Sequence, residues 1–288
     1  FKMKLEMINI IKDEYKNFNT NLKIGIIIFF IILLIGLFAP FLTQYDPLYQ
    51  DYNSLLLPPS FDHLFGTDNY GRDIFTRVIY ATRLDLQIGF YTTYVPLIYG
   101  VMIGAYSGYF GGSIDTIMMR LTDTAMAFPF LILIIFILSI LGPGIQNIYI
   151  AVFLVAWTMY ARLIRAEMLV EKNKDYIVAA QVLGFGTNRI IFKHAMPNII
   201  TSCIIFSMFD FVLNILLVSG LSFLGLGVQP PIPEWGAMVA EGRDFILNAW
   251  WISTLPGFFI LLTGFALCLI GDGLSERFGK RNQYTVSV

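Results

Sequence analysis

The sequence predicts an all-α, polytopic membrane protein with six transmembrane helices. Of its 288 residues, 57% are hydrophobic and only 14% are charged, whereas about 25% of the residues in an average soluble domain are charged. The apolar residues gather in uncharged segments of about 20 residues, which is the length that an α-helix needs to cross the hydrocarbon core. The longest of these segments is interrupted by glycine and proline.

Each expected span follows from a gap between charged or helix-breaking residues. The uncharged stretch 124–161 is too long for one span, and the Gly-Pro-Gly sequence at 142–144 divides it. An amphipathic, interfacial helix over 73–84 is expected at the end of the polar loop 43–85, leading into the second span. The six spans are expected at about 24–42, 87–107, 118–141, 146–161, 198–220 and 252–271.

The chain divides into two regions, and its charges predict their orientation. Residues 1–85 contain a basic N-terminal tail, the first transmembrane helix and an external loop, and residues 86–288 contain a core of five transmembrane helices. With the N- and C-termini in the cytoplasm, 15 of the 19 lysine and arginine residues lie inside and 4 lie outside. The positive-inside rule therefore favours this orientation.

The polar segment 175–197 lies between the fourth and fifth expected spans, on the cytoplasmic side. Residues 175–183 can form about two helical turns, and Gly184 and Gly186 are expected to end that helix because glycine accepts positive φ. Pro197 marks the turn into the next span. A short cytoplasmic helix with small residues on it is a surface on which another protein can dock. The alternative is an ordinary loop helix between two spans.

Asp210 lies near the middle of the fifth expected span. A carboxylate at that depth costs about 2.5–3.5 kcal/mol on insertion scales, so it should face a water-filled path, a neighbouring subunit or a polar partner. We therefore name Asp210 and Asn214 as candidates for lining a transport pathway. A purely structural pairing of the two side chains is the equal alternative.

The sequence contains no pattern that predicts catalysis. It has no phosphate-binding P-loop pattern and no plausible Ser/His/Asp or Cys/His arrangement, so no catalytic residue and no enzymatic activity are expected. His63, Asp68 and Asp73 are too loosely spaced to predict a metal site. Cys203 and Cys268 lie in apolar segments as small buried residues. The near-zero net charge predicts no nucleic-acid partner, and no cofactor is expected on this chain.

Four segments, in order along the chain, resemble one protein family. They are GTDNYGRD at 66–73, the loop 175–197, LSFLGLGVQPPIPEWG at 221–236 and GDGLSERFGK at 271–280. The loop resembles the EAA loop of ATP-binding-cassette importer permeases, with Ala179, Ala180, Gly184 and Pro197 matching and Val178 in place of the usual glutamate. Together the segments resemble the peptide/nickel permeases, specifically the second of their two permease subunits.

This resemblance implies a function, a set of partners and a location. The chain would form half of a pathway for peptide, nickel or metal-chelate uptake in the bacterial inner membrane, in contact with membrane lipid. Its partners would be a second, homologous permease, two ATP-binding subunits that hold ATP and Mg²⁺, and an external or periplasmic solute-binding protein. The ATPase-coupling residues would be Asp175, Tyr176, Ala179, Ala180, Leu183, Gly184 and Phe185. An ion-gradient-driven secondary transporter is the alternative, and it would require intramembrane charge pairs and internal repeats.

Overall fold

The computed structural model describes the backbone of residues 19–286 and the side chains of residues 19–278, and this part of the chain is helical without strands. The basic N-terminal tail that the sequence analysis noted therefore lies almost entirely outside the described residues. Five helices are long and apolar enough to cross a membrane. They are α2 (Thr20–Leu37), α4 (Ile74–Phe110), α7 (Ile145–Glu171), α10 (Met196–Phe223) and α12 (Trp251–Val286).

Two shorter helices bring the number of spans to six if they are counted together as one span. Helices α5 (Gly112–Met126) and α6 (Phe130–Leu141) pass the same test together but are bent by 85°. The span expected over 118–141 therefore falls on two helices with a sharp bend between them, which the sequence analysis did not predict, and a total of up to six spans agrees with the predicted fold class. The reason for the bend is Pro129, which stands at the N-cap of α6, since proline disfavours a helical conformation in the residue before it.

Helix α4 is longer than the expected span over 87–107. It runs without a break from Ile74 to Phe110, with Pro96 inside it. The helix predicted over 73–84 therefore forms, but it is the first part of α4 and continues directly into the next span, because no glycine or proline separates that amphipathic stretch from the apolar residues that follow. Helix α7 likewise continues ten residues beyond its expected end at 161, to Glu171.

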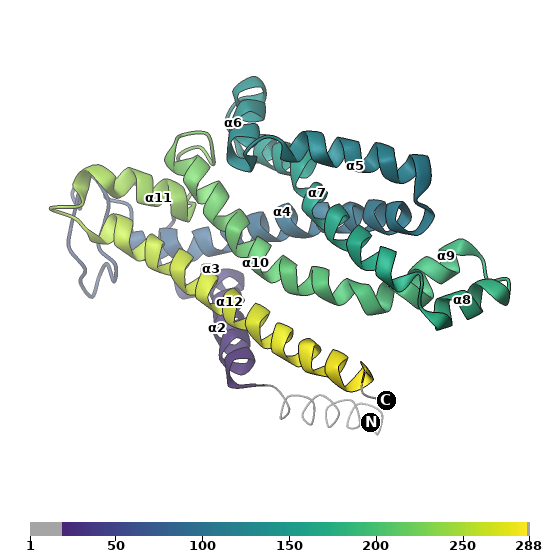
Figure 1. The fold of residues 1–288 in the computed structure, drawn as a ribbon. Helices are drawn as coiled ribbons and strands as arrows, with labels where there is room; N and C mark the ends of the chain where they lie inside the picture. The colour runs from purple at the N-terminus through teal and green to yellow at the C-terminus, as the bar shows by residue number, and fades with distance from the viewer. Residues whose placement is uncertain (1–18, 287–288) are drawn as a thin grey trace.

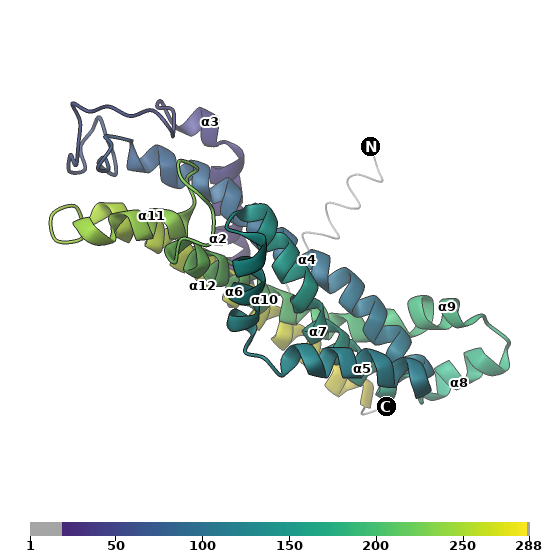
Figure 2. The same cartoon turned by 90° about the horizontal axis from the view of Figure 1, so that it is seen from above.

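The helices form an elongated bundle in which α4 and α7 lie side by side (Figures 1 and 2). Glycines on α4 allow this contact. A Cβ on Gly100 would lie 2.6 Å from the carbonyl oxygen of Trp157, and one on Gly104 would lie 2.3 Å from that of Ala161. The two backbones are therefore in direct contact, as small residues permit between membrane helices.

The two ends of the bundle carry different elements. At one end lie the loop of residues 43–73, which the charges predict to be external, α3 (Ala39–Leu42), α11 (Trp235–Gly242) and the 3-10 turn η2 (Arg243–Phe245), around the buried Trp235 and Trp251. At the other end lie α8 (Asp175–Val182), α9 (Thr187–Arg189) and the π-helical turn η1 (Ile190–Ala195) (Figure 1). The candidate coupling loop is therefore far from the external loop.

Candidate functional site: the α8 loop and the Asp210 cluster

Helix α8 begins and ends where its sequence dictates. Asp175 lies in the first turn, where a carboxylate interacts favourably with the positive end of the helix dipole. At the other end Gly184 has φ +75°, and its N–H donates to the carbonyl of Gln181 at 2.9 Å. The N–H of Phe185 donates to the carbonyl of Ala180 at 3.1 Å, which completes a Schellman motif.

The predicted role of the two glycines is half correct. Gly184 ends α8 through its positive φ, as expected. Gly186 instead has φ −63° and ψ 146° and precedes α9 in an extended conformation, which any residue can adopt. The helix break therefore depends on Gly184 alone.

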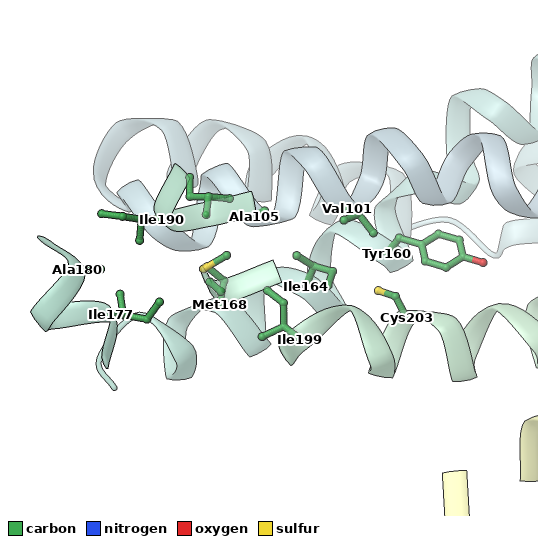
Figure 3. Close-up of a cluster of buried hydrophobic side chains, with 12 residues drawn as sticks. Val101, Ala105, Tyr160, Ile164, Met168, Ile177, Ala180, Ile190, Ile199 and Cys203 are labelled. Atoms are coloured by element: carbon green, nitrogen blue, oxygen red, sulfur yellow. The ribbon is translucent and has the colours of Figure 1, made fainter. Parts of the chain in front are cut away.

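One face of α8 is buried against the transmembrane helices. Ile177 and Ala180 belong to an apolar cluster with Met168 of α7, Ile190 of η1 and Ala105 of α4, as Figure 3 shows. Ile177 is completely buried. The loop is therefore packed onto the ends of the membrane helices, and α8 cannot move without displacing them.

The opposite face of α8 is apolar and exposed. Leu183 is 71% exposed and Val182 is 83% exposed. Together with the exposed Val178 and Ala179 they form what we call the α8 patch (Val178, Ala179, Val182 and Leu183). An exposed apolar patch that is held on a well-anchored element is typical of a protein–protein contact.

Tyr176 joins α8 to the helices before and after the loop. Its hydroxyl donates to the Glu171 carboxylate at the end of α7 and accepts from Asn198 Nδ2 of α10 at 2.7 Å. Partial burial, together with the hydrogen bond to Glu171, raises the pKa of Tyr176 to about 12. The hydroxyl therefore keeps its proton, and with it the bond to Glu171, at neutral pH.

Further hydrogen bonds join the loop to the end of α4. Gln181 Nε2 donates to the Tyr109 hydroxyl at 3.1 Å, and the Tyr106 hydroxyl donates to Asn188 Oδ1 at 2.9 Å. Lys172 Nζ donates to the carbonyl of Gly108 at 2.8 Å. None of these partners was predicted, because they lie more than sixty residues apart in the sequence.

Phe185, the last of the predicted coupling residues, is held between two side chains of the loop. Its ring stacks on His194 with 5.5 Å between ring centroids. The Arg189 guanidinium lies 4.2 Å from the centre of the Phe185 ring. Phe185 therefore fixes the turn between α8 and α9, while the α8 patch remains open.

The predicted pathway residues Asp210 and Asn214 lie in a polar cluster between three helices. Asn214 Nδ2 donates to Asp210 Oδ2 at 3.1 Å, which is the pairing considered from the sequence. The cluster also contains two residues that the sequence analysis missed. The hydroxyl of Tyr160 on α7 donates to Asp210 at 2.7 Å, and Asn214 Nδ2 lies 3.0 Å from Thr93 Oγ1 on α4. The pathway role stays a prediction.

The acidic residues of the external loop have structural partners. Asp73 Oδ2 accepts from the Thr76 N–H and so caps α4, while its Oδ1 lies 2.9 Å from His63 Nδ1. Asp68 Oδ2 accepts from Arg72 Nε at 2.6 Å. Within the side chains that the structure describes, no group of three His, Cys, Asp or Glu residues is placed to hold a metal ion.

Comparison with known proteins identifies the family. Residues 100–284 match the family described as binding-protein-dependent transport system inner membrane component. Residues 19–59 match the N-terminal transmembrane domain of oligopeptide transport permease C. These matches cover α2, the start of the external loop and most of the helical core.

Individual relatives agree with the family match. The chain is 41% identical to the dipeptide transport system permease protein DppC of Alkalihalophilus pseudofirmus over 88% of this chain and 83% of that protein. It is 37% identical to the oligopeptide transport system permease protein OppC of Bacillus subtilis, over 96% of this chain and 91% of that protein.

A solved structure shares the fold. The MetNI methionine ABC transporter in inward-facing conformations has a chain that aligns with a TM-score of 0.51 at 16% identity, covering 69% of this chain and 96% of that chain. The resemblance inferred from the four sequence segments is confirmed by the family matches. The chain belongs to the family of inner-membrane permease components of binding-protein-dependent transport systems.

Proposed function

We propose that this permease forms half of the membrane pathway of an ATP-binding-cassette importer for peptides, and that α8 is its coupling helix. The α8 patch is the observation that carries the coupling role. It is exposed and apolar, and the opposite face of the same helix is buried against the transmembrane helices. A partner that pushes on such a helix moves the membrane helices with it.

Peptides are the cargo that the relatives support. The curated relatives are named for dipeptide, di/tripeptide and oligopeptide transport, and these names favour peptides over the nickel or metal-chelate cargo that the sequence also allowed. Membership of a binding-protein-dependent family likewise favours a solute-binding protein as the donor of cargo, rather than an ion gradient as the driving force.

The proposed mechanism is alternating access. ATP and Mg²⁺ bind on two partner ATPase subunits, and closure of those subunits displaces α8. The displacement passes to α7 and α10 through Tyr176 and to α4 through Gln181 and Asn188. The pathway between this chain and a second permease then opens outward, and release of ADP and phosphate resets it. Asp210 and Asn214 are the candidates for lining that pathway.

The test is a charge placed on the α8 patch. We expect Val182→Asp and Leu183→Asp to remove the ATP-binding subunits from the tagged, membrane-extracted chain, because a carboxylate in an apolar contact must be desolvated. Both side chains are exposed, so folding should be unaffected. Leu247→Asp is the matched control, since Leu247 is 93% exposed at the opposite end of the molecule.

The proposal fails if both patch variants retain the ATP-binding subunits and ATP-dependent uptake at the level of the control. If a variant complex retains its ATP-binding subunits but loses uptake, the α8 patch transmits their motion but is not the surface that holds them.

A further inference from the structure

A groove lies between α2 and α4, away from the α8 loop and from the Asp210 cluster. Its volume is about 630 Å³. Four residues of α2 line one wall with helical spacing, and six residues of α4 line the other at positions 83, 86, 87, 90, 91 and 94. Phe211 of α10 closes the deep end. The groove is therefore built from one continuous face of each helix.

The outer end of the groove is narrow and carries a charge. Gly36 of α2 approaches α4 so closely that a Cβ there would lie 3.2 Å from the Thr82 side chain and 3.3 Å from the Arg83 nitrogen. Arg83 lines the groove beside this contact, and its side chain is exposed. From Arg83 to Tyr94 the wall on α4 is about 16 Å long at 1.5 Å per residue.

Arg83 differs from its neighbours in having no acidic partner. Arg72 and Arg77, at the same end of the molecule, form ion pairs with Asp68 and Glu241. Among the side chains that the structure describes, Arg83 forms no ion pair, and no carboxylate lines the groove. An unpaired cation at the mouth of an apolar groove in a membrane protein offers a site for an anion.

Beyond Arg83 the groove is apolar and aromatic. Leu33 and Leu37 of α2 face Phe90 and Tyr91 of α4, and all four side chains are substantially exposed. Tyr94 and Phe211 meet edge to face at the deep end, with 6.3 Å between their ring centroids. This surface suits a hydrocarbon chain. A zwitterionic peptide would leave its ammonium group without an anionic partner there, because the lining has no carboxylate.

We propose that the groove between α2 and α4 binds one anionic phospholipid, with its phosphate on Arg83 and an acyl chain along the aromatic wall toward Phe211. Arg83 matches the anionic headgroup of such a lipid, and the apolar wall of the groove matches one of its acyl chains. This match is the reason for choosing an anionic phospholipid. The lipid would fill the space between the first helix and the core and would hold α2 in place. This inference does not rest on the transport function.

The test is lipid retention by the purified complex of this chain with its partner subunits. After delipidation, the complex is titrated with phosphatidylglycerol and, separately, with phosphatidylcholine of the same acyl chains, and bound lipid is counted by native mass spectrometry. We expect a phosphatidylglycerol site that Arg83→Gln weakens about tenfold or more, since a hydrogen-bonded charge is lost. Arg83→Lys should retain part of the affinity.

Two further variants make the result specific. Arg120→Gln removes an exposed arginine of α5 that lies outside the groove, and it should leave lipid binding unchanged. Leu33→Trp keeps Arg83 but narrows the trough, and it should weaken binding of the full lipid. Leu33 is 42% exposed, so the larger ring need not disturb the core.

Two results would overturn the proposal. One is equal phosphatidylglycerol binding by the wild-type, Arg83→Gln and Leu33→Trp complexes. The other is a photo-crosslinking residue at Phe90 that joins to the second permease subunit and not to lipid, because the groove would then be covered by protein.

Discussion

Tyr176 and Asp210 show how single polar side chains connect the helices of this permease. Tyr176 contacts Glu171 and Asn198 at the ends of α7 and α10, and Asp210 accepts hydrogen bonds from Tyr160 and Asn214. In each case the hydrogen bonds of one polar side chain link different helices. Removing that group should therefore affect how the helices move together more than whether each of them forms.

We expect Tyr176→Phe to reduce uptake severalfold while the complex still assembles, because α8 loses its bond to α7 and its bond to α10, each worth about 1 kcal/mol. The measurement is peptide uptake and ATP hydrolysis in proteoliposomes. Tyr52→Phe is the control, since among the described residues the hydrogen-bond partner of the Tyr52 hydroxyl is the exposed Gln50 of the same loop, far from α8. Equal uptake by the two variants would exclude a coupling role for the hydroxyl.

The raised pKa of Tyr176 also makes a pH prediction. The protonated hydroxyl is favoured in the folded protein, so its contribution is complete below the ordinary pKa of 10 and is lost as pH rises toward about 12. Wild-type and Tyr176→Phe complexes should therefore show the same pH profile of ATP hydrolysis between about pH 6 and 9. A difference confined to that range would show that the hydroxyl ionises there.

Two substitutions of Asp210 separate the effect of losing a hydrogen-bond acceptor from the effect of losing the negative charge. We expect Asp210→Leu to destabilise the protein by about 1–3 kcal/mol, because the Tyr160 hydroxyl and the Asn214 amide lose their buried partner. Asp210→Asn keeps an acceptor oxygen and should cost less, as measured by thermal unfolding of the purified complex. If Asp210→Asn keeps stability but loses uptake of cationic peptides, the carboxylate has a role in the pathway.

At the scale of elements, the contact between α4 and α7 depends on glycine. Gly100, Gly104 and Gly108 recur every four residues on the side of α4 that faces α7, and a Cβ at each would lie within 3 Å of an α7 atom. For Gly100 and Gly104 the nearest atoms belong to the backbone, so no side-chain rotation can relieve the clash. The two helices must separate if either glycine is replaced.

We expect Gly104→Ala to destabilise the protein by about 1–3 kcal/mol, the usual cost of overpacking. Gly220→Ala on α10 is the control, because a Cβ there would have no neighbour within 4 Å, and alanine is the better helix former. The stability of the two variants is measured by thermal unfolding and by the amount of each protein in the membrane. Equal stability of the two variants would show that α4 and α7 are farther apart in the membrane.

At the scale of the whole molecule, the elongated bundle separates the α8 loop from the external loop. The charge distribution predicts that the α8 loop is cytoplasmic. We expect Val182→Cys to be protected from a membrane-impermeant maleimide in intact cells and Phe61→Cys to be labelled, after Cys203 and Cys268 are replaced by alanine. Both positions are highly exposed in this chain, and the labelling is done on the chain expressed without the ATP-binding subunits, so that protection reports the side of the membrane and not a bound partner. The reverse pattern would invert the proposed orientation.

Much of this architecture could be predicted from the sequence because membrane spans are local features of composition. The number of spans, the short helix after the fourth span and its end at Gly184 all follow from neighbouring residues. The bend at Pro129 also has a local signal, which is the proline itself. It was missed because Pro129 lies within a long uncharged stretch. The contacts of Gln181 and Asp210 with α4 and α7 have no local signal, since they depend on how the helices lie in space.

Helix α4 is about 55 Å long at 1.5 Å per residue over its 37 residues, which exceeds the roughly 30 Å of the hydrocarbon core. One end is bonded to the α8 loop through Tyr106 and Tyr109, and the other to α11 through Asp85. A substitution that weakens the contacts at one end of α4 should therefore be compensated by second-site substitutions at the other end. Selection for restored uptake in a Gln181→Ala strain should yield second-site changes around α11, at the opposite end of the molecule.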